Sequence, residues 1–256
     1  RFREMGGGLE YLRSARDLHE RGLYVELGAY RSQVFLDFRE VRDAQGAPYA
    51  ELDAALGGRG VPSLDDALAD LVLRPVQQVL KDDGVYVYHT KINTKPAIEG
   101  TVWQWHQDYG SWMRDGCRRP DMATVNLMMT DTTEMGGALY LIPGSHKLGR
   151  IEPVYDESTS YKFWAMPKQR MIEILKSSPE PVAVTGRAGT CVLFHCNVLH
   201  ASGHNLSADD RWHIYVSCNT VANKPALGDN PRPDWVVSRN WNPLPLEADD
   251  GVLKAA

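Results

Sequence analysis

The chain is poor in cysteine and lacks the cysteine pairs that bind structural zinc. Its 256 residues include four cysteines, and no two are spaced as Cys-x-x-Cys, which argues against a zinc ribbon. Three of the four lie in or beside apolar segments, where a free thiol behaves as a small hydrophobic side chain. The four are Cys117, Cys191, Cys196 and Cys218. We interpret all of them as reduced, and no signal-peptide pattern precedes the first helix-like segment, so we expect a cytoplasmic protein.

Long hydrophobic runs and an excess of positive charge are also missing. The longest apolar stretches, such as residues 192–194, fall far short of a membrane span. The formal net charge is −5 and the pI is about 5.9, with no stripe of basic residues, so we expect neither a nucleic-acid nor a membrane partner. Hydrophobic residues make up 43% and charged residues 24%, which excludes a disordered or fibrous chain. We expect a small-molecule substrate, and a homodimer remains open.

The first third of the sequence predicts a mainly helical part, residues 1–83. Three helices are expected in it, over residues 9–21, 33–43 and 64–81. Residues 44–63 are rich in Gly, Ala and Pro and predict a loop with a helical turn near residues 52–56. Pro75 is expected to kink or divide the third helix.

From residue 84 onward the sequence changes to short alternating runs separated by Gly, Pro, Asn and Asp, which are typical of strands and turns. Strands are expected over residues 85–95, 123–130, 137–142, 190–195 and 211–218, with a helix over 167–177. Strands with partly polar inward faces favour a jelly-roll barrel that lines a ligand cavity. We predict a mainly β protein with flanking helices in a single domain over residues 1–256. Its parts are a β core over 84–222, an insert near 149–181 and a C-terminal wrap over 223–256.

Two of the eight histidines stand in a metal-ligand pattern. His106 and Asp108 are two residues apart, and on a strand such residues project from the same face. His200, in a turn-rich stretch, is the best candidate for a third ligand. Two histidines and one carboxylate form the facial triad of non-haem Fe(II) oxygenases, which leaves positions open for a co-substrate and O2. On a helix, His200 and His204 would instead form a zinc pair, but Gly203 argues against a helix there.

An arginine at the start of the next strand fits a dicarboxylate co-substrate. Arg211 lies eleven residues after His200. A keto acid that chelates iron through one end needs a cation for its far carboxylate, and arginine binds carboxylates with a two-pronged donor geometry. Ser202 is close enough in sequence to add a hydroxyl donor. A surface salt bridge from Arg211 to Asp209 or Asp210 is the alternative role.

Several stretches also carry a family resemblance. Trp-His-Gln-Asp at 105–108, Gly-Gly-Ala-Leu-Tyr-Leu-Ile-Pro-Gly-Ser-His at 136–146, and His200 followed by Arg211 resemble the phytanoyl-CoA dioxygenase family. The resemblance covers roughly residues 64–222. It implies an Fe(II)- and 2-oxoglutarate-dependent oxygenase with a double-stranded β-helix, cupin-like core. Within the family, residues 91–95 and 103–109 are similar to bacterial hydroxylases of free amino acids, of the leucine type, and of ectoine.

The resemblance also implies a role for each matching residue. The matching positions are His106, Asp108 and His200 as iron ligands and catalytic residues, and Arg211, Ser202, Asn93 and Thr124 as 2-oxoglutarate-binding residues. Related halogenases lack the carboxylate ligand so that a halide can bind there. The presence of Asp108 therefore implies oxygen rebound rather than halogen transfer.

Aromatic residues just after the motif are our candidates for the substrate pocket. Tyr109 and Trp112 follow it directly, and Arg118 lies in the loop beyond. Arg118 could receive a substrate carboxylate, and a solvated loop charge is an equal alternative. Residues 1–63 match the family poorly, so the resemblance does not define the substrate.

We predict an Fe(II)/2-oxoglutarate-dependent dioxygenase that hydroxylates an unactivated C–H bond of a small polar metabolite, a free amino acid or a compound derived from one. One alternative keeps the cofactors in a tailoring oxygenase that hydroxylates, desaturates or epoxidises a larger natural product. Another is a cupin-like metal-binding module that does not use 2-oxoglutarate. The presence of both Arg211 and Asn93 argues against the module, which needs no dicarboxylate clamp.

Overall fold

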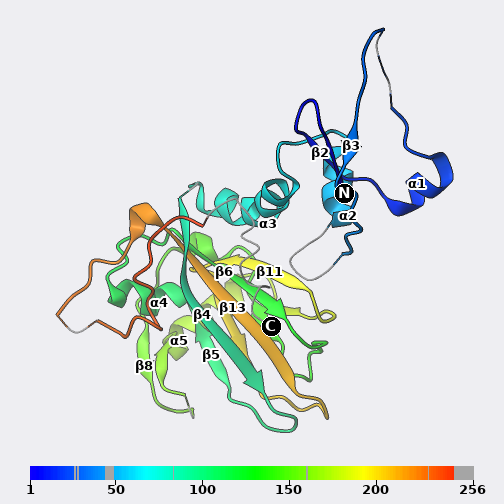
Figure 1. The fold of residues 1–256 in the computed structure, drawn as a ribbon. Helices are drawn as coiled ribbons and strands as arrows, with labels where there is room; N and C mark the ends of the chain where they lie inside the picture. The colour runs from blue at the N-terminus through cyan, green and yellow to red at the C-terminus, as the bar shows by residue number, and fades with distance from the viewer. Residues whose placement is uncertain are drawn as a thin grey trace. The chain divides into compact units, whose positions relative to one another are not determined.

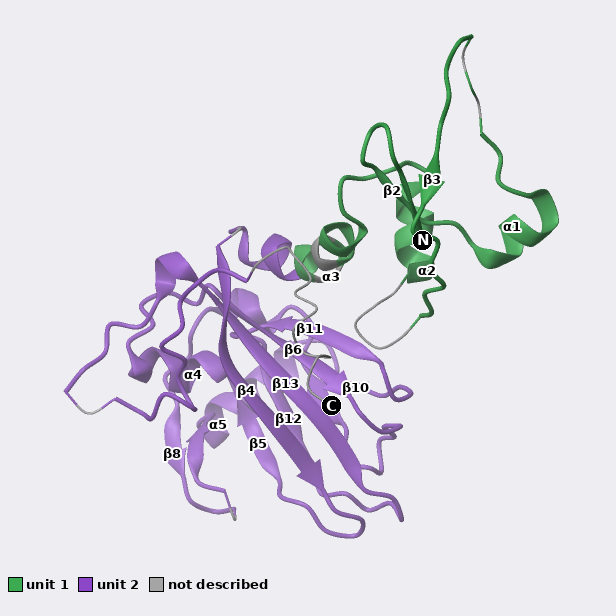
Figure 2. Cartoon of the chain, in the orientation of Figure 1, with its two compact units in different colours: residues 1–75, 245–256 green, residues 76–244 purple. Residues whose placement is uncertain are grey.

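The computed structural model describes residues 1–25, 27, 29–43, 49–82, 84–159, 161–229 and 231–244. The described residues form two compact units, one within residues 1–75 and the other over residues 76–244 (Figure 1, Figure 2). A single domain over the whole chain stays a prediction. None of the described helices is long and apolar enough to cross a membrane.

The first unit combines a small sheet with helices. Its strands are β1 (Phe2–Glu4), β2 (Glu10–Tyr11) and β3 (Phe35–Leu36), in the antiparallel order β2-β1-β3. Its helices are α1 (Ala15–Arg21), α2 (Tyr49–Leu56) and the first part of α3 (Leu64–Leu80). Buried leucines form its core, namely Leu12, Leu52, Leu56, Leu64 and Leu68.

The sequence prediction for this unit is correct only in part. The helix expected over residues 9–21 begins at Ala15, because β2 pairs with β1 and the Ser14 side chain caps the helix by accepting from the Asp17 backbone N–H at 3.4 Å. The helix expected over residues 33–43 is wrong. Phe35 pairs with β1 there, and its ring packs edge-on against Phe2 at 5.3 Å between centroids. Tertiary pairing has overridden a local helical pattern.

Helix α3 runs through Pro75 without interruption, so the expected division does not occur. An interior proline removes a backbone donor and costs about 3 kcal/mol. Buried side chains hold both halves of the helix in place, with Leu64 and Leu68 before the proline and Val76 and Leu80 after it. Each buried side chain of this size contributes about 1.5–3 kcal/mol, enough to offset the proline.

The second unit is a jelly roll of two four-stranded antiparallel sheets, as the sequence predicted. The first sheet has the order β10 (Val182–Val184), β7 (Leu139–Leu141), β12 (His200–Ser202) and β5 (Trp103–His106). The second has the order β11 (Cys191–His195), β6 (Met122–Met128), β13 (Arg211–Thr220) and β4 (Val85–Lys95).

Alternation along β13 makes the interior of this unit partly polar. Arg211, His213 and Ser217 are buried, whereas Trp212 between them is 45% exposed. The register of β13 with β6 pairs Ser217 with Thr124, which is also buried. Paired residues project from the same face, so these polar groups lie together inside the sheet.

The segment between β7 and β10 contains the insert. A hairpin of β8 (Val154–Asp156) and β9 (Phe163–Ala165) precedes α5 (Lys168–Ser177), which coincides with the helix expected over 167–177. The remaining elements are α4 (Asp108–Trp112), directly after β5, and the short helices η1 (Met113–Asp115), η2 (Ser145–Leu148) and η3 (Val221–Asn223). Strand β9 contacts both α4 and β5, so the hairpin lies beside the end of β5.

The chain beyond η3 runs back along β4. The Ser238 N–H donates to the Tyr88 carbonyl at 2.9 Å, and the Leu244 N–H donates to the Val85 carbonyl at 2.7 Å. Val237 is 1% exposed and packs in the core cluster that contains Tyr88. Residues 245–256 of the expected C-terminal wrap lie outside the described residues.

Candidate active site

Three buried side chains meet at the end of β5. His106 is the last residue of β5, Asp108 is the first residue of α4, and His200 opens β12 directly opposite His106. The Oδ1 atom of Asp108 lies 4.0 Å from Nε2 of His106 and 3.8 Å from Nε2 of His200. The sequence predicted this trio but placed Asp108 on the strand. The strand ends between the two motif residues, so Asp108 reaches the site from the start of a helix.

The protonation states of the three residues suit a metal ion. Nδ1 of His106 lies 2.7 Å from the Gln104 carbonyl, and Nδ1 of His200 lies 2.9 Å from the Val198 carbonyl. A carbonyl only accepts, so each Nδ1 carries the proton and each Nε2 lone pair is free. Burial lowers the pKa of His106 to about 3 and also lowers the pKa of His200. Burial alone would raise the pKa of Asp108, but its interactions with His200 and then Lys91 outweigh this effect and the pKa is lowered.

A hydroxyl orients the carboxylate of Asp108. The Thr124 Oγ1 donates to Asp108 Oδ2 at 3.2 Å and lies 3.2 Å from the Ser217 Oγ. This contact leaves Oδ1 directed at the two histidines. Two neutral imidazoles and one carboxylate are the donors that a facial triad offers to Fe(II). In the described part of the chain, His106, Asp108 and His200 form the one group of three or more potential ligands close enough to hold an ion.

Arg211 is a buried cation that lacks an anionic partner. It is 2% exposed, and among the described residues no carboxylate pairs with it. Its Nη2 donates to Asn93 Oδ1 at 2.7 Å, its Nη1 lies 2.9 Å from His213 Nδ1, and its Nε has no partner. The surface salt bridge to Asp209 or Asp210 is absent. Because burying an unpaired charge is costly, this arrangement fits an anionic ligand.

A second buried cation lies beside Arg211. Lys95, 1% exposed, is the register partner of Arg211, and its ammonium donates to the carbonyls of Thr101 and Gly203. Burial and then the charge of Arg211 lower the pKa of Lys95 to about 7. Ser202 is buried as well, and it lies two residues after His200 on the same face of β12. Sequence reasoning did not single out Lys95.

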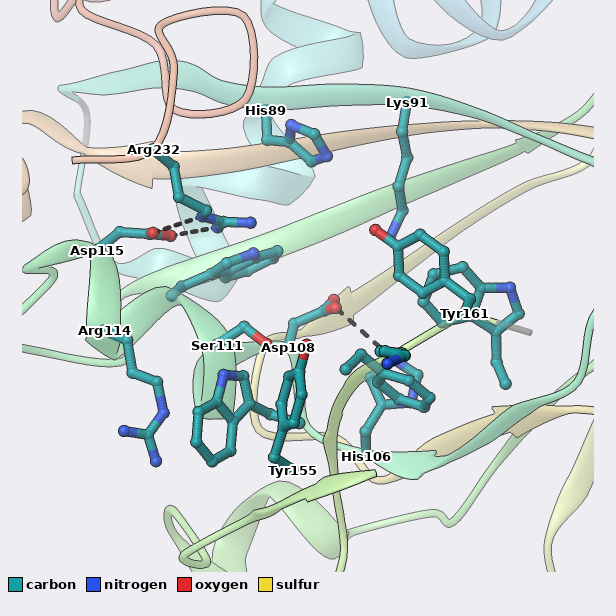
Figure 3. A pocket seen from close by; sticks show the side chains of 15 residues that line it. His89, Lys91, His106, Asp108, Ser111, Arg114, Asp115, Tyr155, Tyr161 and Arg232 are labelled. Carbon is teal, nitrogen blue, oxygen red and sulfur yellow. Dashed lines mark hydrogen bonds and ion pairs between the residues drawn. The ribbon is translucent and has the colours of Figure 1, made fainter. Parts of the chain in front are cut away.

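A cavity of about 390 Å³ opens onto His106 and Asp108 (Figure 3). Its residues come from β4, β5, α4, η1, the β8–β9 hairpin and the chain beyond η3. Six aromatic residues line it, namely Trp103, Trp112, Tyr155, Tyr161, Phe163 and Trp164. His106 and Asp108 form part of its floor, so a bound molecule would lie next to the metal site.

The cavity is rich in positive charge. Arg232 donates from Nε to Asp115 Oδ1 at 2.6 Å and makes a second contact to Oδ2, and Arg114 bonds to Glu152 at 3.0 Å. Lys91 differs, because none of the described carboxylates forms an ion pair with it. Its ammonium lies 5.5 Å from the ring centre of Trp103 and 5.1 Å from that of Tyr215. Figure 3 shows Lys91 extending from β4 into the cavity.

Of the three predicted substrate residues, one lines the cavity and two do not. Trp112 lines the cavity and packs against Tyr88. Tyr109 lies in the hydrophobic core with its hydroxyl bonded to the Cys117 carbonyl at 3.1 Å, and Arg118 is exposed and outside the cavity lining. Lys91 was missed, although it stands two residues before Asn93 on the same strand. Arg232 could not have been found, because only the fold brings its segment to the site.

Comparison of the sequence with known proteins gives consistent matches. Residues 40–212 match the family model of phytanoyl-CoA dioxygenase. L-proline trans-4-hydroxylase of Streptomyces griseoviridis is 34% identical over 212 residues, which cover 74% of this chain and 76% of that protein. The ectoine dioxygenase of Nocardia farcinica is 33% identical over 199 residues, covering 72% of this chain and 66% of that protein.

Solved structures give the same result. The crystal structure of EctD from S. alaskensis with 2-oxoglutarate and 5-hydroxyectoine has a TM-score of 0.56 and 28% identity, and the match covers 68% of this chain and 57% of that one. The same protein with bound Fe has a TM-score of 0.57 and 26% identity, with 72% and 60% covered. The chain therefore spans less than two thirds of these structures.

Proposed function

This chain belongs to the phytanoyl-CoA dioxygenase family of Fe(II)/2-oxoglutarate-dependent oxygenases, and from that premise we propose that it hydroxylates an unactivated C–H bond of a small metabolite with a carboxylate, a free amino acid or a compound derived from one. The observation that carries the proposal is the combination of two sites in one unit. A buried His-Asp-His trio faces a cavity, and the buried Arg211 of the same unit has an unpartnered Nε and no carboxylate partner among the described residues.

The residues divide the work as follows. His106, Asp108 and His200 would hold Fe(II), and Arg211 with Asn93 would bind the distal carboxylate of 2-oxoglutarate, with Ser202 as an added hydroxyl donor. When bound, Fe(II) and 2-oxoglutarate with O2 convert a C–H bond to C–OH while 2-oxoglutarate becomes succinate and CO2. Thr124 keeps one oxygen of Asp108 directed at the iron position.

Lys91 is our candidate for the group that recognises the substrate carboxylate. It is the cavity cation without an ion-pair partner among the described carboxylates, and aromatic rings flank its ammonium. The Nδ1 atom of His89, on the same strand, is buried without a partner and lines the cavity as well. A carboxylate at Lys91 and a polar group at His89 would fix the substrate at one end. The carbon to be oxidised would then lie toward His106.

The β8–β9 hairpin supplies the means to exclude water. Tyr161 and Phe163 pack around Trp103, with ring centres 4.5 and 5.2 Å away. Arg114 lies 3.7 Å above the Trp164 ring, which ties the hairpin to η1. An apolar wall next to the metal ligands holds a small hydrocarbon frame and keeps bulk water from the reaction.

The size of the cavity favours a small substrate over a larger natural product. Its volume of about 390 Å³ is near the lower end of the range of about 300–1,000 Å³ for ligand pockets. The Asp108 carboxylate stands where related halogenases would bind a halide, which supports oxygen transfer over halogenation. A homodimer and a cytoplasmic location stay predictions, tested by sedimentation and by fractionation of the native host.

The test begins without oxygen. Fe(II) and then 2-oxoglutarate are added to the apo-protein, and the visible metal-to-ligand charge-transfer band is recorded. We expect the band in the wild type and its loss in Asp108→Ala. Proline, ectoine and other free amino acids are then tested for a shift of the band and for succinate formation, each beside its analogue without the carboxylate. Absence of the band would overturn the oxygenase, and equal turnover of the decarboxylated analogues would overturn the role of Lys91.

A further inference from the structure

We propose that His213 is a positioning residue that fixes the Arg211 guanidinium, and thereby sets the preference of the site for a 2-oxo acid with a distal carboxylate. The inference rests on the proposed function, because it concerns how the co-substrate is held. His213 lies two residues after Arg211 on β13 and is fully buried. None of the metal ligands is among its hydrogen-bond partners.

The partners of His213 define its tautomer. Its Nε2 lies 2.8 Å from the Thr132 Oγ1, and that hydroxyl donates its own hydrogen to the Thr130 carbonyl at 3.3 Å. The Thr132 oxygen therefore accepts, and His213 carries its proton on Nε2. The Nδ1 atom is then unprotonated, and its lone pair faces Arg211 Nη1 at 2.9 Å and Asn126 Nδ2 at 3.1 Å. Both of these groups can only donate, so every contact of the ring is consistent.

The neutral His213 ring accepts a hydrogen bond from Nη1 on one side of the Arg211 guanidinium. Asn93 Oδ1 accepts from Nη2 on the other side at 2.7 Å. The two contacts hold both terminal nitrogens of the planar guanidinium, the Tyr215 side chain interacts with it as well, and the Nε–H is left without a partner. A planar donor held at two points keeps its remaining N–H groups in a fixed direction, which is what two-pronged binding of a carboxylate requires.

The ring also stays uncharged. Burial, and then the charges of Arg211 and Lys95, lower the pKa of His213 to about 3. A protonated ring would present an N–H to Nη1 and repel the guanidinium. A carboxylate in this position would hold Arg211 as well, but it would neutralise the charge that the co-substrate needs. A neutral histidine orients the cation and leaves its charge available.

The experiment compares co-substrate binding in His213→Leu and His213→Asn, with Mn(II) in place of iron and no turnover. Calorimetric titration gives the dissociation constants of 2-oxoglutarate and of 2-oxovalerate, which has the same chain length without the distal carboxylate. We expect His213→Leu to raise the constant for 2-oxoglutarate roughly tenfold or more, since one hydrogen bond to a charged group is lost, and to leave that for 2-oxovalerate unchanged. Asparagine places an oxygen near the position of Nδ1 and should restore most of the affinity.

A double-mutant cycle shows whether His213 acts through Arg211. In the Arg211→Met background, His213→Leu should cause no further loss of 2-oxoglutarate affinity. Thr132→Val, which removes only the contact to Nε2, is the milder variant should His213→Leu fail to fold, and we expect a few-fold loss. Equal affinity for 2-oxoglutarate in wild type, His213→Leu and Thr132→Val would overturn the inference. Failure of the wild type to bind 2-oxoglutarate at all would instead overturn the proposed function.

Discussion

Replacement of Arg211 by methionine should separate folding from co-substrate binding. In the folded protein, Arg211 is 2% exposed and has hydrogen bonds to Asn93 and His213 but no carboxylate partner among the described residues. Burial of the guanidinium costs several kcal/mol, and each of its two hydrogen bonds contributes about 1.5–3 kcal/mol. Methionine removes both the burial cost and the hydrogen bonds of the guanidinium, and His213 Nδ1 keeps the Asn126 Nδ2 as a donor at 3.1 Å. The terms nearly cancel, so the free energy of unfolding of the apo-protein should change by less than about 2 kcal/mol.

The loss of 2-oxoglutarate binding in Arg211→Met has no such compensation. At 2-oxoglutarate concentrations of about 100 Kd, the wild type should gain about 2.7 kcal/mol of stability. For a chain of this length, that gain corresponds to a rise in Tm of roughly 5–10 °C. Arg211→Met should show almost none of this rise at the same concentration.

Thermal unfolding of both proteins with Mn(II), with and without 2-oxoglutarate, gives the two quantities in one experiment. Arg211→Lys is the matched control, which keeps the charge but loses the two-pronged geometry, and we expect it to recover part of the rise in Tm. A loss of more than about 4 kcal/mol in the apo-protein would refute the reasoning, because it would mean that Arg211 is a paired, structural ion. An undiminished rise in Tm for Arg211→Met would refute it too.

Three further predictions follow from the same geometry. Lys91→Met should raise the substrate KM roughly ten- to a hundredfold with little change in the 2-oxoglutarate KM, and Lys91→Arg should recover much of it; a change confined to the 2-oxoglutarate KM would assign Lys91 to the co-substrate instead. Thr124→Val frees the second oxygen of Asp108 and should weaken Mn(II) binding about tenfold by titration, whereas unchanged binding would show that the hydroxyl does not orient the ligand. The apo-protein should lose stability as the pH falls from about 6.5 toward 3, because the pKa of His106 and that of His213 lie at about 3 in the folded state and near 6.5 when unfolded, so the unfolded chain takes up more protons. The slope should approach 1.4 kcal/mol per pH unit for each histidine, and a flat profile in urea unfolding between pH 7 and 5 would contradict the burial of neutral rings.

The barrel strands were predictable because their pattern is local. Arg211, Tyr215 and Ser217 alternate with outward residues, and a period of two in such a run specifies a strand and its inner face without knowledge of its partners. The N-terminal unit was less predictable. Residues 33–43 have a helical pattern, yet Phe35 finds an aromatic partner in Phe2, far away in sequence, and pairs with β1. The packing energy of such a long-range contact outweighs the local helical preference, and it cannot be judged from the neighbouring residues alone.

The sequence by itself predicted the His-Asp-His trio that the structure brings together, and it singled out Arg211 as a candidate clamp. Iron chemistry needs particular donor atoms, and a His-x-Asp motif followed by a distant histidine and an arginine can be recognised in the sequence alone. Only the tertiary structure decided the rest of the site. The Asp108 carboxylate turns in from a helix, Thr124 orients it, and His213 meets Arg211 inside the sheet. Lys91 and Arg232 come to one cavity from segments about 140 residues apart. Their proximity depends on how the strands pair and where the chain folds back, which residue types and spacing do not encode.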